Sequence, residues 1–285
     1  MKTRSSKLLI TTLSLLATTL PAYSAIRRNL PGFSTNTLAA NDDNSTGQVP
    51  IGFTINLFGT SYSSLYVNNN GNVTFDNPLS EFTPFSLTST ATKILAPFFA
   101  DVDTRGPGSG LVTYGNATVN GHNAFGVEWP NVGYYNSQTN KKNTFELVII
   151  DRSDLGVGNF DFEFNYDQIQ WETGGASGGN NGLGGSSARA GYSNGITGAG
   201  NASLELPGSA VNGALLDGGV NALVTHDLND TNLGRYVFSV RNGAINGTPT
   251  TPVSTANGAP ALTMPMVLFT GVLLIALVWR RFRLA

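Results

Sequence analysis

One stretch of strict alternation limits the possible folds of this chain more than any other feature. Residues 160–167 read Phe-Asp-Phe-Glu-Phe-Asn-Tyr-Asp, with an aromatic ring at every second position. Successive side chains of an extended strand point to opposite faces, so the four rings share one face and the four polar groups the other. The stretch therefore predicts a β-strand whose aromatic face, including Phe160, Phe162 and Phe164, is buried in a hydrophobic core.

Similar alternation recurs along the middle of the chain. Segments with period-two hydrophobicity occur at 51–58, 65–75, 125–129, 145–150 and 236–240. Asn-Gly pairs supply the positive backbone angles of tight hairpin turns. Examples of such pairs begin at Asn70, Asn120, Asn194, Asn212 and Asn242. We expect an all-β protein whose body, residues 36–243, is a single antiparallel β-sandwich-like domain.

A buried strand that ends in charged residues provides the first candidate site. Residues 94–100 are apolar, which predicts a strand covered on both faces, with Pro97 at an edge or a bulge because it has no amide donor. Asp101, Asp103 and Arg105 follow at every second position, so their side chains leave the strand on one face. Calcium prefers oxygen ligands, and one hypothesis is a calcium site at Asp101 and Asp103 completed by other loops. The alternative is a salt-bridged strand end.

A polar loop carries the second candidate site, a binding surface formed by Tyr134, Tyr135, Asn136 and Gln138. Tyrosines in a loop can stack on a sugar ring or on a partner protein. The alternative is that these rings pack against neighbouring loops. Residues 174–187 form a long glycine-rich loop, which is long enough to be functional.

The chain offers few residues for catalysis. A hydrolytic triad would require a positioned serine beside His122 or His226, the two histidines present. Residues 175–179 match a nucleophile-elbow pattern, but they lie in a glycine-rich loop and not between a strand and a helix. Glu128 and Glu163 are isolated in the sequence, although carboxylates on different strands can converge. These observations predict a protein that is not an enzyme.

Charge and cysteine content exclude further classes of function. Six of the sixteen Lys and Arg residues lie in the terminal segments, so residues 25–261 hold ten of them against all eighteen Asp and Glu. This difference of −8 argues against nonspecific binding to nucleic acid. The chain has no cysteine, which excludes disulfides and thiolate metal sites.

The two ends of the chain have the composition of targeting segments. A basic start and an apolar run predict a signal peptide over residues 1–24. Residues 262–279 are long and apolar enough to form a transmembrane helix, and the basic tail 280–285 predicts a cytoplasmic end. Residues 244–261, rich in Gly, Pro, Ser and Thr, predict a flexible linker. We therefore expect an exported protein held at the cell surface by its C-terminal helix.

Several stretches together resemble the nidogen-like extracellular domain, known as NIDO. They cover most of the body, at 65–75, 94–105, 125–129, 143–151, 159–171 and 190–192. The resemblance implies an extracellular β-rich module of matrix and cell-surface proteins that is associated with cell–matrix adhesion. It implies no catalytic residues.

The C-terminal segment resembles the sorting signals of bacterial exosortase systems, although the Pro-Glu-Pro motif of their best-known class is absent. Together these resemblances predict a non-enzymatic bacterial surface module for adhesion or for contact with a matrix or biofilm. Its expected partner is an extracellular protein, a cell-surface protein or a polysaccharide. The alternative is an envelope protein that binds or processes carbohydrate.

Overall fold

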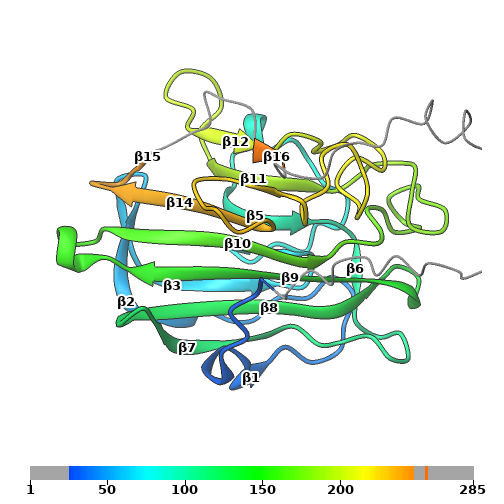
Figure 1. Cartoon of the computed structure of the whole chain (residues 1–285), viewed down its shortest axis with the longest axis horizontal. Helices are drawn as coiled ribbons and strands as arrows, with labels where there is room; N and C mark the ends of the chain where they lie inside the picture. Colours follow the sequence, from blue (N-terminus) through cyan, green and yellow to red (C-terminus); the bar gives the residue numbers. More distant parts are fainter. Residues whose placement is uncertain (1–25, 247–253, 256–285) are drawn as a thin grey trace, which may run out of the picture.

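The computed structural model describes residues 26–246 and 254–255, and the alternating stretch lies at its centre as strand β10 (Phe160–Gln168). β10 pairs antiparallel with β9 (Gln138–Asp151) on one side and with β14 (Arg235–Arg241) on the other. They belong to an eight-stranded sheet, the larger sheet, with the order β1-β7-β8-β9-β10-β14-β15 and with β6 paired to β8 (Figure 1). Its other strands are β1 (Asn36–Thr37), β6 (Val102–Asp103), β7 (Thr113–Val119), β8 (His122–Tyr134) and β15 (Ala244–Asn246).

The smaller sheet has six antiparallel strands in the order β12-β11-β5-β4-β3-β2. These strands are β2 (Val49–Leu57), β3 (Thr60–Asn68), β4 (Asn72–Thr74), β5 (Lys93–Phe99), β11 (Arg189–Asn194) and β12 (Ser203–Glu205). Two short strands pair with each other, β13 (His226–Asp227) and β16 (Ser254–Thr255). The helical turns are of the 3-10 type, η1 (Pro31–Ser34), η2 (Leu87–Ser89) and η3 (Ser153–Leu155). The predicted all-β antiparallel architecture is confirmed for the described residues.

The aromatic face of β10 lies in the core between the two sheets, as its alternation predicts. Phe160, Phe162 and Phe164 are fully buried. Phe162 stacks on Phe238 of β14 with ring centroids 4.6 Å apart, and it meets Tyr192 of β11 edge-on at 6.1 Å. Because β14 and β11 belong to different sheets, the two sheets bury one shared core, which is the arrangement of a β-sandwich.

Strand β5 confirms one expectation for Pro97 and corrects the other. Every residue of β5 after Lys93 is buried, and β5 lies between β4 and β11 inside the smaller sheet, so Pro97 is not at an edge. The register with β11 shifts between the pairs formed by Ala96 and Phe99, and Pro97 lies within this bulge. A bulge leaves a backbone position unpaired, so the missing amide of proline loses no hydrogen bond of the ladder.

The polar face of β10 is also covered, which its alternation alone does not indicate. Residues 26–28 lie across this outer face of the larger sheet. Arg28 forms a two-bonded ion pair with Glu163, at 2.9 and 2.5 Å, and Arg27 pairs with Asp167 at 2.8 Å. As a result Glu163 is only 3% exposed. The packed body therefore includes residues that precede the predicted domain boundary.

A small second core lies on the same outer face. Phe33 of η1 is fully buried there, directly above Gly126 of β8. A Cβ at position 126 would lie 2.3 Å from Cγ of the Phe33 ring, so only glycine allows this close approach. Phe33 packs with Val119, Ala124, Val148 and Ile150. This packing explains why β9 is apolar on both faces in its second half.

Glu146 of β9 is buried beneath residues 26–28 and links stability to pH. Its Oε2 accepts hydrogen bonds from the Arg28 amide at 3.0 Å and the Asn165 side chain at 2.8 Å, whereas its Oε1 has no partner. Burial raises the pKa of Glu146 to about 7. The folded pKa lies above the ordinary value of 4.5, so the folded state binds this proton more tightly than the unfolded state. This contribution to stability is complete below pH 4.5 and is lost as the pH rises through about 7.

We therefore expect the Glu146→Gln variant to gain stability relative to the wild-type chain as the pH rises. Glutamine keeps an acceptor for the two hydrogen bonds but carries no charge. The difference in free energy of unfolding between the two proteins should grow by about 2–3 kcal/mol between about pH 4 and about pH 8. Urea unfolding at both pH values measures it. Glu81→Gln, at an exposed carboxylate, is the control and should show no such change. An unchanged difference for Glu146→Gln would contradict the assignment.

The targeting segments predicted at the two ends lie outside the described residues. They are the signal peptide 1–24, the helix 262–279 and the tail 280–285. Within the described residues, no helix has the length and hydrophobicity needed to cross a membrane. The predicted linker 244–261 is not irregular throughout, because it contains β15 and β16. β15 pairs with β14, and Ile245 packs against the core.

Candidate functional site

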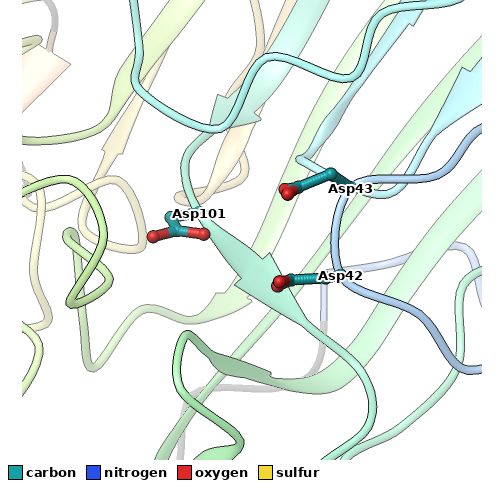
Figure 2. Close-up of side chains that lie close together, drawn as sticks. All are labelled: Asp42, Asp43 and Asp101. Atoms are coloured by element: carbon teal, nitrogen blue, oxygen red, sulfur yellow. The ribbon is translucent and has the colours of Figure 1, made fainter.

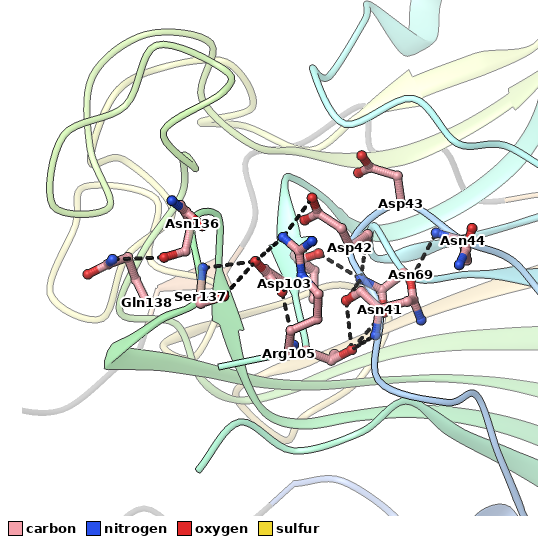
Figure 3. A network of polar contacts seen from close by, with 12 residues as sticks. Asn41, Asp42, Asp43, Asn44, Asn69, Asp103, Arg105, Asn136, Ser137 and Gln138 are labelled. Carbon is pink, nitrogen blue, oxygen red and sulfur yellow. Dashed lines mark hydrogen bonds and ion pairs between the residues drawn. The ribbon is translucent and has the colours of Figure 1, made fainter. Parts of the chain in front are cut away.

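Four loops meet at one end of the sandwich, where β5 and β6 end and the β8–β9 hairpin turns. Figure 3 labels residues of three of them. These loops are residues 41–44, 101–105, 134–138 and 173–187. Backbone hydrogen bonds join them in pairs. The Thr104 amide donates to the Asn41 carbonyl at 2.9 Å, the Tyr135 amide to the Asp101 carbonyl at 3.2 Å, and the Gly175 amide to the Tyr135 carbonyl at 2.8 Å. All the residues predicted as calcium ligands or as a binding surface lie at this end.

Asp103 is held by hydrogen bonds from its own loop and from the hairpin. Its buried carboxylate accepts from Nε and Nη2 of Arg105 at 2.9 and 2.7 Å, and from the amides of Arg105 and Ser137 at 2.9 and 2.8 Å. Burial would raise the pKa of Asp103, but these bonds outweigh it and lower the pKa. At Asp103 the salt-bridged alternative describes the structure, and its carboxylate is occupied by protein donors.

Asp101 lies in a different environment, with the carboxylates of Asp42 and Asp43 converging on its own (Figure 2). One oxygen from each of the three side chains lies within 4.8 Å of the other two. Burial, reinforced by the charges of Asp42 and Asp43, raises the pKa of Asp101 to about 7. Burial and the neighbouring carboxylates of Asp43 and Asp103 raise the pKa of Asp42 to about 6. We call these three residues the aspartate cluster. Of the three, only Asp101 was predicted from the sequence as a ligand. Asp42 and Asp43 lie in the polar run 41–44, which was the one local indication of a site there.

A groove of about 330 Å³ lies beside this cluster, between the β8–β9 hairpin and the glycine-rich loop. Its lining residues carry hydroxyl, amide and backbone groups and no charge. They are Tyr134, Tyr135, Asn136, Gln138, Gly175, Gly179, Asn180 and Asn181. All four residues predicted as a binding surface belong to this set. The glycine-rich loop supplies the opposite wall, which sequence reasoning marked as a long loop without assigning it to the same site.

The two tyrosines of the groove differ, although the sequence predicts the same exposed role for both. Tyr135 is half-buried, whereas Tyr134 is 2% exposed. The Tyr134 ring packs 5.3 Å from Trp171, and its hydroxyl donates to Asn140 Oδ1 at 2.8 Å. Tyr134 therefore forms the floor of the groove, and Tyr135, Asn136 and Gln138 offer the accessible groups.

Glu128 and Glu163 converge on the outer face of the larger sheet together with Glu146. Glu128 and Glu146 are direct partners on β8 and β9. Arg27 pairs with Glu128 at 3.1 Å, and Arg28 pairs with Glu163. A general acid and base need access to a substrate, whereas these carboxylates are buried under residues 26–28. Their arrangement is that of a structural charge network.

Ser177 and His226, both noted in the sequence, also make structural contacts. Ser177 is buried, and its hydroxyl lies 3.2 Å from the hydroxyl of Thr83 and donates to the Phe82 carbonyl at 3.3 Å. His226 Nδ1 lies 2.8 Å from the Ala222 carbonyl. No hydrogen bond between a serine and a histidine occurs within residues 26–246 that would resemble a hydrolytic pair.

Comparison with known proteins gives a consistent set of similarities. A family model described as NIDO related matches residues 16–215. Mouse alpha-tectorin is 35% identical over 183 residues, which cover 54% of this chain and 8% of the tectorin, and human alpha-tectorin is 36% identical over the same shares. Nidogen of Drosophila melanogaster is 30% identical over 120 residues, 34% of this chain and 9% of the nidogen. No solved structure gives a significant match. The similarity thus spans less than a tenth of each of these much longer relatives.

Proposed function

Since the chain belongs to the NIDO-related family, we propose that its sandwich is a non-enzymatic extracellular module that contacts a matrix component through the groove. The family resemblance points to cell–matrix adhesion. The observation that carries the proposal is the groove itself, an uncharged surface of amides and one half-buried ring on loops joined by backbone hydrogen bonds. Such a surface recognises a neutral partner by hydrogen bonds and ring contact.

The position of the groove supports this function. Binding residues are disproportionately found on loops held by a rigid scaffold. Here the hairpin wall continues directly from β8 and β9, and the glycine-rich wall is attached to the hairpin through Gly175 and Tyr135. The loops are therefore held in place before a partner arrives, which reduces the entropy lost on binding.

Replacing Tyr135 with alanine should weaken binding to matrix extracted from the producing cell by about tenfold or more, since a central aromatic contact contributes about 2 kcal/mol to an interface. Retention of the purified chain on immobilised matrix measures this effect. Tyr66→Ala, which removes another half-buried tyrosine on the outer side of β3, is the matched control and should retain wild-type binding. Equal binding by the Tyr135→Ala variant and the wild-type chain would argue against the groove as the contact surface.

The second candidate is a carbohydrate-binding or carbohydrate-processing protein of the envelope, favoured by the combination of Tyr135 with four amide side chains. An aromatic ring stacks on a sugar face, and amides bond to its hydroxyls. The amides come from Asn136, Gln138, Asn180 and Asn181. A glycan array and a glycosidase screen on the purified chain distinguish the candidates. Selective binding without turnover would make a polysaccharide the matrix partner, and turnover would remove the non-enzymatic function.

We also propose the arrangement of the chain around this module. Residues 1–24 act as a signal peptide, 36–243 contain the NIDO-like body, 244–261 space it from the membrane, and 262–279 anchor it at the surface, followed by the tail 280–285. The composition of each segment supports this order. An alternative for the last two segments is removal by exosortase-like processing. Mass spectrometry of the native protein tests both, with an N-terminus at Ala25 as the expected result and the mass of the C-terminal fragment reporting whether the anchor is kept.

A further inference from the structure

Asp101 is deeply buried, and neither of its carboxylate oxygens meets a donor of the described residues at normal hydrogen-bond geometry. It is 1% exposed, and the Ser177 amide lies close enough to favour the ionised form. Arg105, the cation of the loop 101–105, bonds to Asp103 and Asp42 instead. Burying a carboxylate without a partner is strongly unfavourable. The surroundings of this side chain therefore favour a positively charged ligand.

The remaining two members of the aspartate cluster point their carboxylates to the same place (Figure 2). Asp42 contributes Oδ1, which is buried and has no hydrogen-bond partner. Asp43 accepts one hydrogen bond, from the Asn70 side chain at 2.9 Å. One oxygen from each of the three side chains lies within 4.8 Å of the other two, and two oxygens bound to one Ca²⁺ at about 2.4 Å can lie at most about 4.8 Å apart. We propose that Asp42, Asp43 and Asp101 together bind one calcium ion.

The chemistry of the cluster selects calcium over other metals. All its donors are carboxylate oxygens, which are hard ligands, and the chain has no cysteine to attract a softer metal. Magnesium usually binds through one or two carboxylates in a strict octahedron, whereas calcium accepts three or more in a flexible shell of six to eight oxygens. Asp42 and Asp43 are half-buried, so water can reach the ion from their side and complete that shell.

The proposed site joins parts of the chain that are far apart in the sequence. Asp42 and Asp43 precede β2, whereas Asp101 follows β5. The glycine-rich loop closes over Asp101, since a Cβ at Gly174 would lie 2.3 Å from Asp101 Oδ2. A bound ion therefore replaces repulsion between three carboxylates by attraction and holds these segments together. The ion would stabilise this end of the sandwich, whatever the groove binds.

Thermal unfolding of the chelator-treated purified chain tests the proposal. Calcium added at pH 8 to about a hundred times its dissociation constant should raise the melting temperature by about 5–10 °C, and calorimetric titration should give one ion per chain. Magnesium should give a smaller shift. Asp101→Asn preserves the shape of the side chain, so it should fold while losing both the shift and the binding heat. Glu81→Gln removes a nearby exposed carboxylate and should respond like the wild-type chain.

Two results would overturn the proposal. One is an unchanged melting temperature of the wild-type chain at millimolar calcium. The other is a calcium-induced shift of equal size in the Asp101→Asn variant, which would mean that the ion binds elsewhere. Loss of matrix binding in the Tyr135→Ala variant is measured separately, so the outcomes for the ion site and the groove remain distinguishable.

Discussion

Replacing Phe162 with alanine is expected to lower the free energy of unfolding by about 3–5 kcal/mol, the usual cost of removing a large buried ring. The ring is fully buried and contacts Phe238 in its own sheet and Tyr192 in the opposite sheet. Alanine would leave a cavity between the two sheets, and strands fixed by hydrogen bonds on both sides of β10 cannot collapse into it.

Urea unfolding of the Phe162→Ala variant measures this loss. Phe82→Ala is a matched control, because Phe82 is half-buried and lies outside the hydrophobic clusters of the described residues. It should cost less than half as much. A loss below about 1 kcal/mol for Phe162→Ala would mean that the aromatic face of β10 is not the core of the sandwich.

Replacing Arg28 with alanine should have a similarly large effect, about 3 kcal/mol or more, because it leaves buried carboxylates without their counter-charge. The Arg28 guanidinium makes two bonds to Glu163, and the Arg28 side chain is 19% exposed. Once it is removed, Glu163 keeps a hydrogen bond from Asn165 at 3.2 Å and a distant ion pair with Arg235 at 3.8 Å. These contacts do not compensate for a carboxylate that is 3% exposed.

A double-mutant cycle separates this effect from simple loss of packing. Glu163→Gln introduced into the Arg28→Ala variant removes the unpaired charge and should restore about half or more of the lost stability. Arg152→Ala is the control, because one partner of Arg152, Asp154, is 44% exposed and the other, Asp161, keeps an ion pair with Arg241 at 2.7 Å. It should cost about 1 kcal/mol or less. If Glu163→Gln restores nothing, the stabilisation by Arg28 comes from its contacts with other groups.

The behaviour of the aspartate cluster follows from long-range contacts that the sequence does not encode locally. The spacing of Asp101 and Asp103 correctly indicated a polar cluster at the end of a buried strand. It suggested equal roles for both. The pairing of β6 with β8 brings the Ser137 amide to Asp103, whose own loop supplies Arg105. Asp42 and Asp43 approach Asp101 from before β2. No local periodicity predicts that meeting, because it depends on how the loops at the end of the sandwich are arranged.

In the groove, too, local sequence and tertiary structure give different information. Tyr134 and Tyr135 are neighbours in a polar loop, and composition alone gives them one role. The pairing of β8 with β9 changes register after Trp129 and again after Val132, and Asn131 has a positive φ of 51°. These irregularities change which positions of β8 face the core, so Trp129 and Tyr134 are both buried. Tyr135 is left beside the groove as a consequence of the bulge.

The sequence by itself determined the class of the fold, because period-two patterns and Asn-Gly turns are local and a strand with one aromatic face has few ways to bury it. It also determined the resemblance to the NIDO domain. The tertiary structure decided which polar groups meet: residues 26–28 over Glu146 and Glu163, and Asp42 and Asp43 beside Asp101. Side-chain alternation fixes the face on which a residue lies, whereas its neighbours across a sheet or at a loop end depend on register and topology.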